Sequence, residues 1–172
     1  METFLAHLYW WSVLFCYCLA AEELKNVVTE YVTKSECRLD KERLRELLSK
    51  VTDEQKLNIL QQTKSVVARM TALHKAAQRG HADVLKAVLT TLQSWDRLKI
   101  LFAKDYMKRT PLHEAVFSDQ TESVKAILDS LRADEQLQLL KEQEWYGKTP
   151  VEMASGEMLD VLAEYENGAN EG

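Results

Sequence analysis

A four-residue motif that begins with threonine occurs three times in this 172-residue protein, always at the same spacing. The copies are Thr71-Ala72-Leu73-His74, Thr110-Pro111-Leu112-His113 and Thr149-Pro150-Val151-Glu152, so the start positions differ by 39 in both steps (110 − 71 and 149 − 110). The surrounding sequence repeats as well: Val- and Leu-rich stretches follow the first two copies, and similar segments at 53–60, 95–101 and 134–140 precede all three. Self-similarity at a fixed period is typical of proteins in which one structural unit stacks on the next.

The motif predicts the start of an α-helix. The hydroxyl of Thr110 can accept hydrogen bonds from the first free backbone N–H groups, and Pro111 then falls at the first helical position, where its missing N–H costs nothing. The stretch at 84–92 has apolar residues three to four apart, which predicts a second helix with one buried stripe. The chain holds only five Gly and two Pro to interrupt helices. We therefore predict an all-α fold of two helices per unit.

These units resemble the ankyrin repeat, which has a TPLHxAA-type helix start, a GH-like turn and a second helix rich in Val and Leu. Gly80-His81 supplies the turn in the first unit, and Gly147 matches the glycine that usually precedes the motif. The usual repeat is about 33 residues long, and we assign the surplus here to an extra short helix between units. The resemblance covers residues 69–166 and implies an ankyrin-type helical repeat solenoid of about three repeats.

Two units depart from the family pattern. The second has Ser118-Asp119-Gln120 where a GH turn would stand. The third has Val151-Glu152 in place of Leu-His, and Ser155-Gly156 predicts an early end to its first helix. The departures of the third unit are typical of a terminal repeat that faces solvent. Residues 167–172 are expected to be a helix stop followed by a frayed tail.

The N-terminal part of the chain lacks the motif. Apolar stripes at 24–32 and 44–51 predict helices, and we expect residues 22–68 to form an N-terminal cap that includes a degenerate repeat without its motif helix. Thr52, with Gln55 three residues later, predicts a capping box. Residues 1–21 form an apolar leader with three interpretations: a signal peptide cleaved after Ala20, a membrane anchor, or a buried helix that covers one end of the fold.

The resemblance implies a module that binds another protein, with no cofactor and no catalytic or metal site. In this family the stretches before each motif form protruding fingers, and the fingers and first helices make a concave surface that holds the partner. Exposed aromatic groups at finger tips are typical of binding hot spots, although these could instead fold back over the extra helix. The candidate partner-binding residues are Tyr106, Met107, Trp145 and Tyr146 on the fingers and Lys75, Gln78, Arg79, Glu114 and Phe117 on the exposed face of the first helices.

Composition narrows the function further. The net charge of −5 argues against a nucleic-acid partner, which would require a basic face. The three cysteines form no CxxC pair, and no nucleophile with an adjacent base or Gly-rich phosphate loop is visible. His74 and His113 are one repeat apart and are interpreted as structural. We expect a monomeric, cytoplasmic, non-enzymatic scaffold; the alternatives are a secreted or membrane-tethered effector and, more remotely, an enzyme of unrecognised class.

Overall fold

The structure of the protein is a computed structural model, and it describes residues 19–28, 41–61 and 69–170. These residues form helices joined by turns, without a strand among them. After a helical segment at 19–28, the helices are α2 (Lys41–Lys50), α3 (Asp53–Gln61), α4 (Ala72–Gln78), α5 (Ala82–Thr91), α6 (Ser94–Leu101), α7 (Pro111–Phe117), α8 (Thr121–Leu128), α9 (Ala133–Leu140), α10 (Pro150–Met153) and α11 (Glu157–Asn170). The prediction of an all-α repeat solenoid is confirmed.

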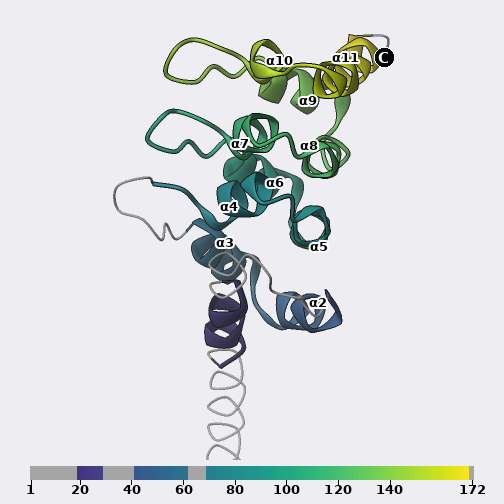
Figure 1. Cartoon of the computed structure of the whole chain (residues 1–172). Coiled ribbons are helices and arrows are strands. Elements are labelled where there is room, and N and C mark those ends of the chain that lie inside the picture. Colours follow the sequence, from purple (N-terminus) through teal and green to yellow (C-terminus); the bar gives the residue numbers. More distant parts are fainter. Residues whose placement is uncertain (1–18, 29–40, 62–68, 171–172) are drawn as a thin grey trace, which may run out of the picture.

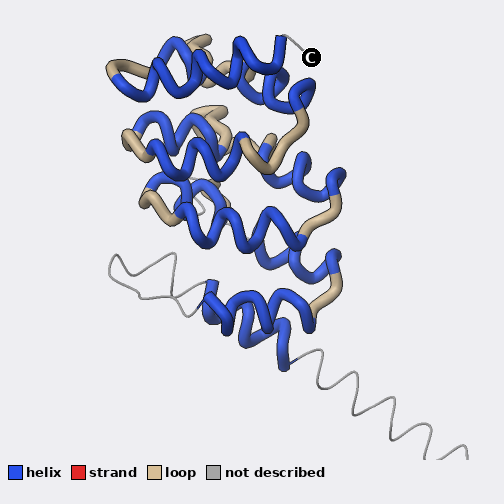
Figure 2. Tube along the Cα trace, turned by 90° about the vertical axis from the view of Figure 1, so that its right-hand side faces the viewer, coloured by secondary structure: helices blue, strands red, loops and turns tan. Residues whose placement is uncertain are grey.

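The units stack with equivalent helices in contact (Figure 1). The first helices pack in the order α4, α7, α10, and the second helices in the order α2, α5, α8, α11. The extra short helices predicted between units are present as α3, α6 and α9, and α3 packs on α6. Figure 2 shows the units rising one above another with turns along both edges. Long loops project from the first-helix side in Figure 1, and these are the fingers.

The core lies between the first and second helices. Leu112 and Ala115 of α7 and Ala77 of α4 are fully buried, as the inward-facing positions of the motif predict. The small side chains of Ala77 and Ala115 let α4 and α7 approach closely. Because each repeat buries its apolar face only against its neighbours, the stack as a whole is the unit of stability.

The linking helices also satisfy backbone groups at the ends of the second helices. Arg97 of α6 donates hydrogen bonds to the carbonyl oxygen of Leu92 (3.1 Å) and to that of Ser130 in the next unit. Gln136, its equivalent in α9, donates to the carbonyl oxygen of Leu128 (2.9 Å). The last carbonyls of a helix have no donor within the helix, so these side chains complete the helix ends, and Arg97 also ties its unit to the next.

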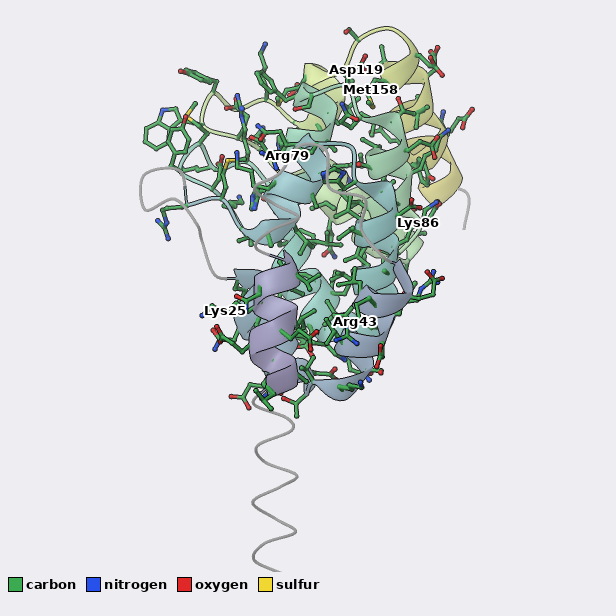
Figure 3. The ribbon with its side chains drawn as sticks, turned by 60° about the horizontal axis from the view of Figure 1, so that its bottom comes forward. Lys25, Arg43, Arg79, Lys86, Asp119 and Met158 are labelled. Atoms are coloured by element: carbon green, nitrogen blue, oxygen red, sulfur yellow. The ribbon has the colours of Figure 1, made fainter. Side chains whose placement is uncertain are left out.

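The helical segment at 19–28 packs beside α2 and against the first repeat (Figure 3). Ala20, Leu24 and Val28 are buried in the same core as α2, α4 and α5, and Glu23 is ion-paired with Arg43 of α2. The apolar stripe at 24–32 predicts a helix, and its described part lies in this segment, which serves as the first helix of an N-terminal unit that has no threonine motif. Thr52 and Gln55 form the predicted capping box.

The helical segment includes residues 19–21, the last three residues of the apolar leader. Residues 1–18 of the leader lie outside the described residues. The proposed cleavage position after Ala20 falls inside a continuous stretch of packed helix. Within the part of the sequence that the structure describes, no helix has both the length and the apolar character needed to cross a membrane.

The C-terminal repeat has the short first helix that Ser155-Gly156 predicts, because α10 ends at Met153. The predicted helix stop after residue 166 is wrong: α11 continues past Gly168 to Asn170. This helix packs on α8 and α9, and the hydroxyl of Tyr165 donates a hydrogen bond to Oδ1 of Asp129 (2.5 Å). These tertiary contacts hold a helix through a glycine that local preference alone would use to end it.

Candidate functional site

Two fingers, in successive repeats, are built on the same hydrogen-bonded turn. In one, Oδ1 of Asp105 accepts hydrogen bonds from the backbone N–H groups of Met107 and Arg109, both at 2.8 Å. In the other, Oε1 of Glu144 accepts from the N–H groups of Tyr146 (2.8 Å) and Lys148 (3.4 Å). Both carboxylates are buried. The acidic residue at the base of each finger therefore fixes the loop from inside.

Each turn requires a left-handed residue at the same place. Gly147 has φ +80°, and Lys108, its equivalent in the preceding repeat, has φ +58°. Gly80 and Asp119, which are also equivalent positions of successive repeats, share a left-handed conformation in the turn between first and second helices. The Ser118-Asp119-Gln120 sequence, which departs from the family pattern, thus forms the same turn as Gly80-His81. Asp tolerates this region better than most residues.

The fingers present large aromatic side chains to solvent. Tyr106 is 54% exposed, Trp145 63% and Tyr146 74%, whereas Met107 is half-buried. The two fingers also contact each other: the N–H of Trp145 donates to the carbonyl oxygen of Met107 (2.8 Å), and Nζ of Lys108 lies 5.4 Å from the centre of the Trp145 ring. The three aromatic residues are therefore held on a connected pair of loops and do not fold back into the core.

The first helices carry a continuous polar network between the two central repeats. Nζ of Lys75 donates to Gln78 (2.9 Å), and Nε2 of Gln78 donates to Glu114 (3.0 Å). Glu114 also pairs with Arg109 at 3.3 Å, and the Arg109 guanidinium lies 4.5 Å from the centre of the Phe117 ring. The network brings together Lys75, Gln78 and Phe117, three of the candidate residues on the first helices, and Phe117 is 62% exposed.

Glu114 is the one fully buried residue among the candidates predicted to be exposed. It is only 2% exposed, because α4 and the base of the finger cover it and supply its partners. Burial raises the pKa of this carboxyl, and the hydrogen bond and charge of Arg109 act in the opposite direction. Glu114 therefore positions Arg109 and Gln78 and does not itself face solvent. Arg79, at the end of α4, is half-buried.

The fingers and first helices enclose an open groove of about 540 Å³. The candidate residues Phe117 and Tyr146 lie on its wall. Sequence analysis did not identify the other residues of the wall, because the local sequence around a repeated motif does not show which neighbouring repeat a side chain faces. They are Arg109, Glu144, Lys148, Glu152 and Met153.

His74 and His113 have the structural role predicted for them. The N–H of Thr71 donates to Nδ1 of His74 (3.2 Å), so the proton of the neutral ring lies on Nε2, which faces the carbonyl oxygen of Arg109 at 2.9 Å. The N–H of Thr110 donates in the same way to Nδ1 of His113 (3.3 Å). Both rings are fully buried, and burial lowers both pKa values, that of His113 to about 4.

A second exposed apolar area lies on α6, away from the fingers. Trp95 is 77% exposed, and with Leu98, Phe102 and Gln138 it lines a shallow hollow of about 220 Å³. The sequence could have indicated this area, because Trp95 has Asp134 as its equivalent in the next repeat, and a position that accepts Asp is typically exposed to solvent.

Comparison with known proteins agrees with the geometry. A family model described as ankyrin repeats (3 copies) matches residues 20–138, well over half of the sequence. The matched region runs from the helical segment at 19–28 through most of α9, so it includes the N-terminal unit that lacks the threonine motif. A search of curated proteins gave no match. The helix pairs, the finger turns and the family match together show that this chain belongs to the ankyrin-repeat family.

Proposed function

We propose that this protein binds a partner protein on the concave surface formed by its fingers and first helices. Ankyrin repeats are generally protein-protein interaction modules. The observation that supports this face is the exposure of Tyr106, Trp145 and Tyr146 on two fingers that are hydrogen-bonded to each other. Large aromatic groups held rigidly in solvent lose little entropy on binding and are enriched at binding hot spots.

Paired measurements of binding and stability test this proposal. Partners captured from lysate by the full-length protein are identified by crosslinking and mass spectrometry, and the affinity of one of them is then measured for each variant. We expect Trp145→Ala and Tyr106→Ala each to weaken binding by about 2 kcal/mol or more and to leave the melting temperature nearly unchanged. Lys86→Ala, on the exposed side of α5, is the matched control and should change neither. Full affinity in a normally stable Trp145→Ala variant would contradict the proposal.

We also propose that the protein acts in the cytoplasm with its N-terminal segment retained. The support is that Ala20 and Leu24 are buried in the core on the two sides of the possible cleavage position. Intact-mass measurement of the protein recovered from eukaryotic cells tests this. A mature protein that starts at Ala21 or Glu22 would instead favour the secreted alternative.

A further inference from the structure

The charge of the molecule is unevenly distributed. Segments 69–79, 104–118 and 142–153, which hold α4, α7 and α10 and the fingers before α7 and α10, contain seven Lys and Arg against five Asp and Glu, a net charge of +2. Since the net charge of the whole molecule is −5, the remainder has a net charge of −7. These finger and first-helix segments are therefore net positive in a protein whose net charge is negative.

Burial increases this contrast, because three of the five acidic residues on the concave side are inside the structure. Asp105 and Glu144 are each 5% exposed and accept backbone hydrogen bonds within the finger turns, and Glu114 is 2% exposed and paired with Arg109. The charges that reach solvent there are mainly cationic. Lys108 and Lys148 are exposed on the fingers, and Lys75 and Arg79 are half-buried along α4. Arg79 follows α4 at the turn into α5, whereas Lys86 lies on α5 itself, and Figure 3 shows the two residues apart from each other.

The apolar part of the same surface is displaced towards the C-terminal end of the stack. Phe117, Tyr146 and Met153 line the groove between the second finger turn, α7 and α10. The cations Lys75 and Arg79 belong to the preceding repeat. A peptide that runs along the concave surface would thus meet positive charge first and an aromatic groove next.

We propose that the occupant of this surface is an extended acidic segment of a partner protein, in which a large apolar residue lies next to the acidic ones. This inference rests on the proposed function and adds the chemistry of the partner. The carboxylates lie over Lys75, Arg79 and Lys148, and the apolar side chain enters the groove beside Phe117. The other residues that the structure describes hold 12 Lys and Arg against 17 Asp and Glu, a net charge of −5, which repels such a segment and favours its approach to the concave side.

A peptide library tests the proposal without knowledge of the natural partner. Random dodecapeptides displayed on phage are selected on the immobilised full-length protein, and the enriched sequences are synthesised with a fluorescent label for affinity measurements by anisotropy. We expect clusters of Asp and Glu next to a Leu, Phe, Trp or Met. The affinity should fall as salt rises from about 50 to about 300 mM, because the Debye length shortens over this range.

Charge-reversal variants then locate the binding site. Lys148→Glu and Lys75→Glu should each raise the Kd of the selected peptides about tenfold or more, and Phe117→Ala should do so with less change in the salt dependence. Lys86→Glu makes the same charge change on α5 and should stay within about twofold of the unchanged protein. Thermal melting of each variant checks that the fold is intact. If Lys75→Glu unfolds the protein, the variants at Lys148 and Phe117 still test the proposal, because both side chains are exposed.

The possible results are distinguishable. Enriched peptides that are basic or uncharged, or a library without enrichment of acidic sequences, would overturn the inference about partner chemistry and leave the proposed protein-binding face standing. A labelled oligo-dT that binds the same face and is weakened by Lys148→Glu would overturn it in favour of a polyanionic nucleic acid. Acidic peptides that respond equally to Lys86→Glu and Lys148→Glu would overturn the placement. Failure of the proposed function itself shows separately, as partner binding that Trp145→Ala leaves intact.

Discussion

Protonation of His113 should couple the stability of the stack to pH. The ring is fully buried, and its Nδ1 accepts the backbone N–H of Thr110 at the start of α7, so only the neutral ring fits the site. Burial lowers the pKa to about 4, although the neighbouring carboxylate of Glu144 acts to raise it. In the unfolded protein the pKa returns to about 6.5. The unfolded state therefore binds a proton more readily, and this contribution to stability is present above pH 6.5 and is lost as pH falls towards 4.

The size of the effect follows from the two pKa values. Between pH 7 and pH 5, proton binding to the unfolded state lowers the free energy of unfolding by about 1.5–2 kcal/mol for one histidine with these pKa values. Most carboxylates remain ionised over this interval, so the histidines dominate the change. His74, whose pKa is also lowered by burial, adds to the total in the same direction.

A His113→Asn variant isolates the contribution of the one ring. Its amide oxygen can replace Nδ1 as acceptor for the Thr110 N–H, but it cannot titrate. The free energy of unfolding is measured for both proteins by urea denaturation at pH 7 and pH 5, at fixed salt, with far-UV circular dichroism. We expect the stability advantage of the unchanged protein to shrink by about 1.5–2 kcal/mol at the lower pH. An advantage that stays equal at the two pH values to within about 0.5 kcal/mol would refute the reasoning.

Two further predictions concern the core. The side chains of Leu112 and Leu73 are 0% and 2% exposed. Leu112→Ala and Leu73→Ala should therefore each lower the free energy of unfolding, measured in denaturant melts, by roughly 2–5 kcal/mol. A decrease below about 0.5 kcal/mol would contradict their place in the core. Leu24→Ala should cost an amount in the same range, because Leu24 is fully buried against α2 and the first repeat, whereas Leu19→Ala, at a residue 56% exposed, should have little effect. Equal melting temperatures for these two variants would show that the segment at 19–28 does not contribute to the fold.

Local sequence determined the parts of this protein that depend on near neighbours along the backbone. The caps of α4 and α7 form between residues three apart, such as Thr110 and His113, so a motif of four residues is enough to predict them. The helical spacing of apolar residues likewise predicts which face is buried, and the constant period of the motif predicts that the units stack. The exposure of Trp145 follows from its place on a finger whose turn is fixed by Glu144, one residue before it.

Tertiary structure decided the features that depend on contacts between units. Glu114 has the sequence position of an exposed residue, but Gln78 of the preceding repeat and Arg109 enclose it. The segment at 19–28 provides a first helix because α2 and α4 offer it an apolar surface, although nothing in its own sequence resembles the motif. The groove beside Phe117 likewise combines residues of two repeats. Backbone capping and helical period are short-range properties. Whether a polar residue such as Glu114 is buried, and what shape a binding surface has, depends on which distant side chains fill the space around it, and only the packed stack determines that.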